Sequence, residues 1–307
     1  MRIFLTGATG YIGAAVLDAL VRGGHEVTAL VRDNSKAART AARGGHPIIG
    51  NLGDPESYRV AAQAQDGYVH TAYDSTSSGG PGVDRTALDV ILAAAKRRRT
   101  PASKSPRKRF IIYTSGVWVL GSAPEPANED SPINPVSLVE WRPDHEQFVL
   151  LAGGAGLRTI VVRPGIVYGG GHGIVGDLLK SASNGLVRVV GDGNNHWPLV
   201  YDRDLADLYA RLAADDDAAG VYHANDEGDE RVNDIVSAIA PYLPVRPDVR
   251  HVPIEEARSK MGAFADALAL DQVVRSPRAR ALGWEPSLHS VAGNAARLLE
   301  EWRASRT

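Results

Sequence analysis

The sequence predicts an α/β protein built on a doubly wound parallel sheet, and three observations lead to this prediction. Short β-rich runs alternate with helical stretches through the first half of the chain, these runs are apolar almost without a break, and a glycine-rich turn follows the first of them. Strands of a parallel sheet read as continuous apolar runs because helices bury both of their faces. Strand–helix alternation also implies right-handed βαβ units.

The apolar runs locate the expected strands at 2–7, 26–32, 46–51, 67–73, 109–115 and 158–164. Helices are expected between them at 11–22, 55–65, 84–99 and 143–155. After residue 165 the pattern loosens into a glycine-rich loop, a helix at 174–184, a short strand, loop and helix over 186–214, a strand at 220–225, and helices at 232–243 and 290–303.

Composition excludes several classes of function. The chain has 307 residues, a net charge of −2 and no cysteine. A chain without cysteine forms no disulfide, no thiolate metal site and no cysteine nucleophile, and this fits a reducing compartment. The near-neutral charge favours neither nucleic acid nor an anionic membrane as a partner. With no leader-like start and no apolar run of membrane length, we expect a cytoplasmic protein.

The glycine-rich turn predicts a dinucleotide site. Gly7, Gly10 and Gly13 follow the first strand and open the first helix. The first glycine allows a tight turn, the second lets the backbone approach a pyrophosphate, and the third lets the helix pack on the sheet. Amide groups at the helix start donate to the phosphates. We therefore expect residues 1–165 to form an NAD(P)-binding core of Rossmann type. Residues 166–307 should complete the sheet and form a small substrate-binding lobe.

The end of the second strand favours NADP over NAD. Arg32 stands where an NAD-selective site carries an acidic residue, and Asp33 follows it. A guanidinium suits a 2′-phosphate by its charge and its fork of donors. In the alternative interpretation, Asp33 binds the ribose and Arg32 faces solvent.

A basic segment at 96–109 contains eight basic residues in fourteen. It is interpreted either as a phosphate-binding or nucleic-acid patch or as a solvated loop whose cations stabilise the end of a helix. The two prolines inside it, Pro101 and Pro106, and the low net charge favour the solvated loop, so no nucleic-acid partner is expected.

Several motifs occur in the order typical of one superfamily: "TGATGYIG" at 6–13, "LVRD" at 30–33, "YTSG" at 113–116, "VVRPGIVYG" at 161–169 and "ALGWEP" at 281–286. Together they resemble the extended and atypical branches of the short-chain dehydrogenase/reductase superfamily, which include NAD-dependent epimerase/dehydratase-like proteins. The resemblance covers nearly the whole chain.

The resemblance implies a role for individual residues. It assigns cofactor contacts to Gly7, Thr9, Gly10, Tyr11, Ile12, Gly13, Arg32, Asn51, Leu52, Thr71, Ala72, Tyr73, Arg163 and Pro164. Ser115 matches the family serine, whose hydroxyl donates a hydrogen bond to the reacting oxygen.

The family's central Tyr-x-x-x-Lys pair is absent. None of the ten tyrosines is followed by a lysine four residues later. Aligning the helix on Glu146 places Arg142 at the lysine and Leu138 at the tyrosine. Arg142 retains a positive charge, whereas Leu138 cannot transfer a proton. Pro143 is best accommodated at the first helical position, so the usual tyrosine position is expected in a loop.

Another group must then act as the acid/base. Tyr201 is the first candidate, although its position before a helix favours its interpretation as a packed aromatic residue. Tyr73 either transfers the proton or covers the cofactor. Histidines suit proton transfer near neutral pH: His172, and His196 beside Trp197, are candidates for the substrate pocket, whereas His145 is expected on the surface. No histidine spacing indicates zinc, so no metal is expected.

Three functions follow, in order of preference. The first is an NADP-dependent oxidoreductase acting on a small carbonyl or alcohol with a non-standard acid/base. The second is a non-catalytic, NADP-binding redox regulator, and the third is a sugar-nucleotide epimerase or dehydratase. The helices at 84–99 and 143–155 also offer a face for a homodimer.

Overall fold

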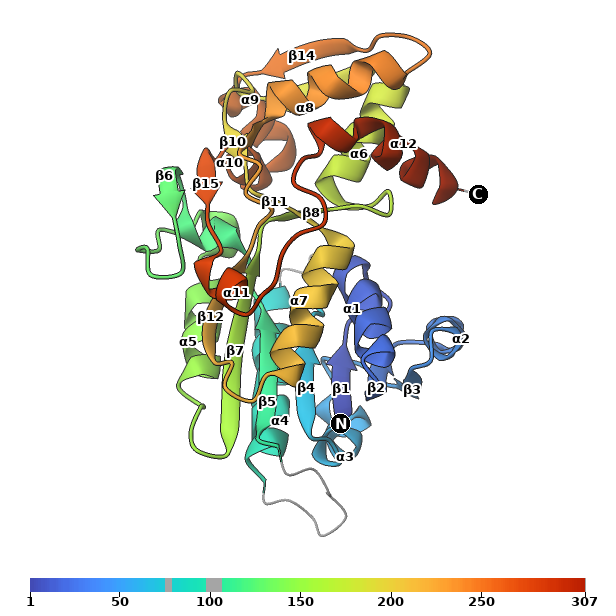
Figure 1. The fold of residues 1–307 in the computed structure, drawn as a ribbon, viewed down its shortest axis with the longest axis vertical. Coiled ribbons are helices and arrows are strands. Elements are labelled where there is room, and N and C mark those ends of the chain that lie inside the picture. Colours follow the sequence, from blue (N-terminus) through green and yellow to red (C-terminus); the bar gives the residue numbers. More distant parts are fainter. Residues whose placement is uncertain (75–78, 98–106, 307) are drawn as a thin grey trace. The chain divides into compact units, whose positions relative to one another are not determined.

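A seven-stranded sheet contains the strands that the apolar runs predict (Figure 1). Its strands are β1 (Arg2–Thr6), β2 (Glu26–Val31), β3 (His46–Ile49), β4 (Gly67–His70), β5 (Arg109–Thr114), β7 (Leu157–Pro164) and β12 (Gly220–Ala224). They lie in the order β12-β7-β5-β4-β1-β2-β3. The pairs β1–β2, β2–β3, β1–β4, β4–β5 and β5–β7 are parallel. The strand order reverses between β1 and β4, and ligands of such sheets bind at the carboxyl ends of the strands there.

The computed structural model describes residues 1–74, 79–97 and 107–306, which fold into two units. Unit 1 comprises 1–115, 141–162 and 206–221, and unit 2 comprises 116–140, 163–205 and 222–307. A division at residue 165 therefore differs from these units at two segments. Residues 116–140 precede residue 165 but belong to unit 2, and residues 206–221 follow it but belong to unit 1.

Helices follow the strands of unit 1, as the alternation predicts. They are α1 (Tyr11–Arg22), α2 (Asn34–Ala42), α3 (Arg59–Gln63), α4 (Gly80–Lys96), α5 (Arg142–Leu150) and most of α7 (Asp202–Ala214). The segment expected as one helix at 55–65 is a 3₁₀ turn (Pro55–Ser57) followed by α3. Ala87, Leu88, Ile91 and Ala95 on α4 recur at helical spacing and are buried, as expected for a helix face packed on a core.

Unit 2 consists of helices and pairs of short strands. Its two-stranded sheets pair β6 (Ala123–Ala127) with β15 (Gln272–Val274), β8 (Ile166–Tyr168) with β11 (Leu199–Tyr201), β9 (Leu186–Val190) with β14 (Asp248–Val252), and β10 (His196–Trp197) with β13 (Glu230–Arg231). Its helices are α6 (Gly173–Ser183), α8 (Val232–Ile239), α9 (Ile254–Met261), α10 (Phe264–Leu268), α11 (Pro277–Ala281) and α12 (Ala295–Ala304). A shared apolar core includes Tyr168, Trp197, Tyr201 and Trp302.

Candidate cofactor and active site

The glycine-rich turn after β1 leaves no room for side chains. A Cβ on Gly13 would lie 2.1 Å from the carbonyl oxygen of Gly7, and Gly7 itself has a φ of 80°. A Cβ on Gly7 would lie 2.7 Å from Oγ1 of Thr71. That hydroxyl donates to the carbonyl of Thr6 at 2.7 Å and so ties the end of β4 to the turn. The structure thus brings together Gly7, Gly13, Thr71 and Ala72, four of the residues predicted to contact the cofactor.

The start of α1 fits a phosphate group. Gly10 is the residue before the helix, and no side chain caps this end. Thr9 precedes it, and Tyr11 and Ile12 supply the first helical amides. The N-terminus of a helix carries partial positive charge and attracts anions.

At the end of β2, the Asp33 side chain contacts a neighbouring residue, whereas the Arg32 side chain is exposed. Oδ1 of Asp33 accepts a hydrogen bond from the backbone of Lys36 at 2.8 Å, and Oδ2 lies 3.4 Å from the Lys36 ammonium. The backbone hydrogen bond lowers the pKa of Asp33. Asp33 therefore caps α2 with one oxygen and pairs with a cation through the other, while Arg32 is exposed.

Asn51 and Leu52 follow β3, where the resemblance places adenine contacts. Oδ1 of Asn51 accepts a hydrogen bond from the backbone of Gly53 at 3.0 Å, which closes a local turn. Leu52 packs against the apolar cluster beneath α3 and α4.

A cluster of rings and one cation lies at the carboxyl end of β4 and the start of α5. The Tyr73 and Trp141 rings stack with centroids 5.1 Å apart and planes 18° apart. The Arg142 guanidinium lies 4.5 Å from the Trp141 ring centroid and 5.2 Å from that of Tyr73. Arg142 also donates to the carbonyl of Thr114, the last residue of β5, at 3.1 Å. This contact fixes the guanidinium against the strand that leads to Ser115.

Ser115 is buried, with 7% of its surface exposed. Its backbone amide donates to the carbonyl of Val162 at 2.8 Å, whereas its Oγ is buried without a hydrogen-bond partner. Buried hydroxyls almost always have a partner. An orphaned hydroxyl at the carboxyl edge of the sheet therefore fits the contact with a ligand oxygen that the resemblance implies.

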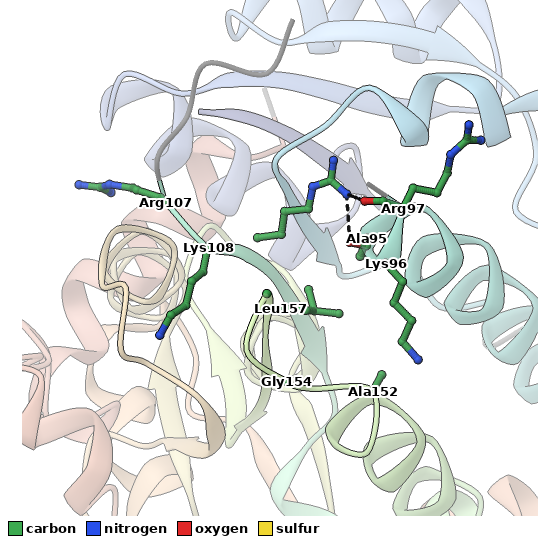
Figure 2. Close-up of a pocket in the computed structure, with 10 residues that line it drawn as sticks. Ala95, Lys96, Arg97, Arg107, Lys108, Ala152, Gly154 and Leu157 are labelled. Carbon is green, nitrogen blue, oxygen red and sulfur yellow. Dashed lines mark hydrogen bonds between the residues drawn. The ribbon is translucent and has the colours of Figure 1, made fainter. Parts of the chain in front are cut away.

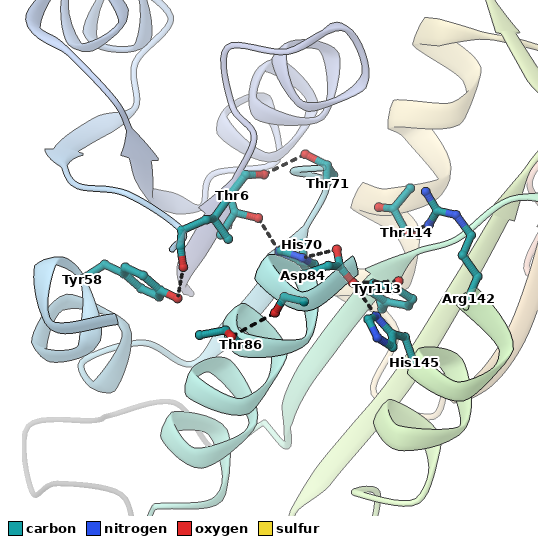
Figure 3. A network of polar contacts seen from close by, with 12 residues as sticks. Thr6, Tyr58, His70, Thr71, Asp84, Thr86, Tyr113, Thr114, Arg142 and His145 are labelled. Carbon is teal, nitrogen blue, oxygen red and sulfur yellow. Dashed lines mark hydrogen bonds and ion pairs between the residues drawn. The ribbon is translucent and has the colours of Figure 1, made fainter. Parts of the chain in front are cut away.

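A buried polar network connects five elements, β1, β4, α4, β5 and α5, beneath this edge (Figure 3). Asp84 of α4 accepts hydrogen bonds from His70 at 3.0 Å, from Tyr113 at 3.0 Å and from His145 at 2.8 Å. His70 continues the network to the hydroxyl of Thr6 at 2.6 Å. His145 is therefore a core residue, and its expected surface position is wrong.

The charge of Asp84 is stabilised despite its burial. Burial opposes ionisation, but the hydrogen bonds from His145 and His70 outweigh it and hold the pKa of the carboxyl well below its usual range. Burial and the neighbouring Asp84 raise the pKa of the Tyr113 phenol.

The helix that carries the family's catalytic pair is altered as the sequence indicates. α5 begins at Arg142, immediately before Pro143. Leu138 lies outside this helix in a 3₁₀ turn (Ser137–Val139), where a loop was expected.

Tyr201 of unit 2 is held by α12. Its hydroxyl donates to Glu301 at 2.9 Å and accepts from Arg297 at 3.2 Å. Burial, followed by the Glu301 carboxylate, raises the pKa of Tyr201 to about 12. These contacts match the interpretation of Tyr201 as a packed aromatic residue.

The remaining predicted residues lie in unit 2 or at the end of β7. His196 contacts Asp271 through Nδ1 at 2.7 Å, and Trp197 donates from its indole to the carbonyl of Leu268 at 3.0 Å. His172 is exposed at the start of α6. Arg163 and Pro164 are the last two residues of β7, and both are buried.

The described part of the basic segment and residues 152–157 line a cavity of about 500 Å³ beside the end of α4 (Figure 2). Lys96, Arg97, Arg107, Lys108 and Arg109 line it. Arg109 donates to the carbonyls of Ala95, at 3.1 Å, and Arg97, and so satisfies the last turn of α4, as cations do at helix ends. Residues 98–106 lie outside the described residues.

Asp84, His70 and Trp141 were missed from the sequence. Asp84 did leave a signal, because it stands three and four residues before Ala87 and Leu88 on the apolar face of α4. A carboxylate in such a position needs buried partners. Nothing in the sequence indicated which histidines supply them.

No helix of the described residues is long and apolar enough to cross a membrane. Their histidine and acidic side chains form no group of three that could hold a metal ion.

Comparisons with known proteins agree with this architecture. Residues 3–224 match the model of the NAD dependent epimerase/dehydratase family. The chain is 32% identical to the protein named Uncharacterized protein C2A9.02 of Schizosaccharomyces pombe, over 95% of this chain and 96% of that one. It is 24% identical to the 4-hydroxy-2-methyl-3-oxo-4-farnesyl-3,4-dihydroquinoline-1-oxide ketoreductase of Stigmatella aurantiaca, over 84% and 78% of the two chains.

Among solved structures, the human epimerase family protein SDR39U1 with NADPH has a TM-score of 0.76 and 21% identity, with 98% of this chain and 99% of that chain covered. This likeness extends over both units and shows that the chain has the same fold. The family model matches more than two thirds of the sequence, and the Schizosaccharomyces pombe relative is 32% identical over nearly the whole chain. The chain therefore belongs to the NAD-dependent epimerase/dehydratase family.

Proposed function

We propose that the protein is an NADP-dependent oxidoreductase that acts on a small carbonyl or alcohol substrate. The observation that carries this proposal is the buried hydroxyl of Ser115, which has no hydrogen-bond partner and lies directly after β5. It is a donor held ready for a ligand oxygen. The Stigmatella aurantiaca relative, named a ketoreductase, supports the same reaction class.

The residues of unit 1 fit a nicotinamide dinucleotide. The turn of Gly7, Gly10 and Gly13 packs too tightly for side chains, and the uncapped start of α1 that follows it attracts the charge of a pyrophosphate. Because Asp33 is engaged with Lys36, Arg32 is the group at this strand end that suits a 2′-phosphate. This favours NADP.

The chain itself supplies positioning and charge. A bound nicotinamide would supply or accept the hydride. Ser115 would donate a hydrogen bond to the substrate oxygen, where negative charge develops as the carbonyl is reduced. Arg142, fixed on the carbonyl of Thr114, would add positive charge at the same edge.

The test is NADPH consumption by the purified protein with a panel of ketones and aldehydes. We expect turnover, a preference for NADPH over NADH, and a loss of roughly 100-fold or more in kcat for Ser115→Ala. Arg32→Ala should weaken NADPH binding by roughly 10-fold and leave NADH binding unchanged, because a charge-assisted hydrogen bond contributes about 1.5–3 kcal/mol.

Three outcomes are decisive. NADPH binding without turnover on any carbonyl would overturn the oxidoreductase and indicate the non-catalytic regulator instead. Unchanged activity in Ser115→Ala would remove the serine from the mechanism. Equal affinities of the Arg32→Ala variant and the parent for NADPH would remove the basis for preferring NADP.

A further inference from the structure

We propose that Tyr73 is the proton donor that replaces the missing helix tyrosine, and that Arg142 supplies the cation beside it. The inference rests on the proposed carbonyl reduction. The two halves of the usual pair would then come from different elements: the phenol from the end of β4, and the cation from the start of α5.

Solvent access selects Tyr73 among the ten tyrosines of the chain. Seven tyrosines are buried: Tyr58, Tyr68, Tyr113, Tyr168, Tyr201, Tyr209 and Tyr222. Unlike the buried hydroxyl of Ser115, the first six of these phenols are already hydrogen-bonded within the protein. Tyr73 is 41% exposed and Tyr242 is 52% exposed. Tyr242 ends a 3₁₀ turn in unit 2, and Tyr11 belongs to the pyrophosphate turn. Tyr73 is thus the reachable phenol at the nicotinamide end of the predicted site.

The sheet register brings Tyr73 to the edge that carries Ser115. β4 and β5 are parallel neighbours in which His70 pairs with Tyr113. Tyr73 follows β4 by three residues, and Ser115 comes directly after β5. Both therefore leave the sheet at its carboxyl edge, beside the point where the strand order reverses.

The ring of Tyr73 is held in one orientation. Trp141 stacks on it at 5.1 Å, and a Cβ on Gly80, the first residue of α4, would lie 3.3 Å from its hydroxyl. The Trp141 ring is itself held edge-on by His145, at 4.8 Å, which Asp84 anchors in the buried network. A phenol fixed in this way loses little rotational freedom when a substrate binds.

The carbonyl carbon gains a hydride, which carries two electrons, from reduced nicotinamide, and the C=O π bond breaks. The oxygen takes a proton from the Tyr73 hydroxyl while Ser115 donates a hydrogen bond to it. The products are the alcohol, the oxidised nicotinamide and a Tyr73 phenolate beside Arg142, and a proton from water restores the phenol.

Charges from three segments act on the phenol. Arg142 on α5 favours the phenolate, whereas Asp84 on α4 and the adjacent Asp74 oppose it. Burial is the largest influence and raises the pKa of Tyr73. The phenol is therefore protonated throughout the neutral range, which suits proton donation to a carbonyl better than proton removal from an alcohol.

The first test compares Tyr73→Phe with the parent. Phenylalanine keeps the stack on Trp141 and removes only the hydroxyl. We expect kcat for carbonyl reduction to fall by roughly 100-fold or more, with the NADPH Kd changed by less than about threefold. The matched control is Tyr242→Phe, which removes an exposed hydroxyl in unit 2 and should leave kcat unchanged.

The second test needs no turnover. The difference in ultraviolet absorbance between the parent and Tyr73→Phe, followed with pH, reports the phenol alone. Arg142→Gln should move this titration to higher pH, because the variant removes the cation that favours the phenolate.

The outcomes separate this inference from the proposed function. An active parent whose Tyr73→Phe variant keeps its kcat within about threefold would overturn the role of Tyr73 and leave the oxidoreductase standing; loss of activity in Tyr201→Phe alone would transfer the role to Tyr201. An Arg142→Gln variant with an unmoved phenol titration would overturn the pairing. A parent that binds NADPH but reduces nothing would overturn both.

Discussion

Asp84 shows how one residue can organise the core beneath a site. Its carboxylate is buried, yet it accepts hydrogen bonds from His70, Tyr113 and His145 on three other elements. A buried charge is costly unless hydrogen bonds satisfy it. Through His145 the network reaches the Trp141 ring, and through His70 it reaches Thr6 at the pyrophosphate turn.

Replacing this carboxylate should destabilise the protein in a pH-dependent way. Asp84→Asn should lower the free energy of unfolding at pH 7 by about 2–4 kcal/mol. The pKa of Asp84 is depressed in the folded state, so its contribution is present above the unfolded value of about 3.9 and is lost as the pH falls below it. Urea denaturation at pH 7 and at pH 4 and below measures both effects.

Asp89→Asn is the control for this prediction. Asp89 lies on the exposed side of the same helix, 3.9 Å from Arg85. Its replacement should change the free energy of unfolding by less than about 1 kcal/mol. If Asp84→Asn retained the full acid sensitivity of the parent, the network would not be the source of that sensitivity.

At the scale of elements, helices and strands were predicted where buried apolar residues recur at a regular spacing in the sequence. They were missed where the sequence has no such spacing. α1 spans the predicted 11–22, because its buried residues recur on one face. α2 was not predicted, since among its nine residues only Thr40 is buried. The two-stranded sheets of unit 2 join segments far apart in the chain, such as β9 and β14, and a strand of five residues carries too little pattern to show its partner.

The turn between β1 and α1 makes the strongest prediction at this scale. Gly13→Ala should raise helix propensity by about 1 kcal/mol, yet its Cβ would lie 2.1 Å from the carbonyl oxygen of Gly7. Backbone must shift to relieve this contact. We expect a net loss of about 1–3 kcal/mol in stability and a loss of NADPH binding measured by fluorescence titration.

Gly82→Ala provides the matched control. Gly82 lies in α4, and a Cβ there would meet nothing within 4 Å. The change should be neutral or stabilise the protein by up to about 1 kcal/mol, without effect on NADPH binding. Equal effects of the two substitutions would mean that the close approach of Gly13 and Gly7 does not limit the turn.

For the whole molecule, the sequence located the glycine turn proposed to bind the cofactor, but it did not show which side chains gather where the reaction is proposed to take place. The turn of Gly7, Gly10 and Gly13 is local, so its spacing alone carries the information. The ring cluster of Tyr73, Trp141 and Arg142 joins segments almost 70 positions apart. Its formation depends on strand order and helix packing, which no local pattern encodes.

The pH dependence of stability is also a property of the whole chain, because its carboxylates act in opposite directions. Asp84 in unit 1 stabilises the fold when it is ionised. Asp226 in unit 2 is 2% exposed, and burial raises its pKa to about 7 although the backbone of Gly228 donates to it at 3.0 Å. Acid should therefore lower the free energy of unfolding by protonating Asp84. A pH above neutrality should lower it by ionising the buried carboxyl of Asp226.

Asp226→Asn tests the second of these contributions. The folded-state pKa of about 7 lies above the unfolded value, so stability is lost as the pH rises from about 4 through 7. Asparagine cannot ionise and avoids this loss. The variant should therefore exceed the parent in unfolding free energy by about 2–4 kcal/mol at pH 8, and by less at pH 5, as measured by urea denaturation. Asp177 lies on the exposed side of α6, so Asp177→Asn should have the same free energy of unfolding as the parent at both pH values. A difference between Asp226→Asn and the parent that stays constant from pH 5 to pH 8 would show that Asp226 does not ionise in this range.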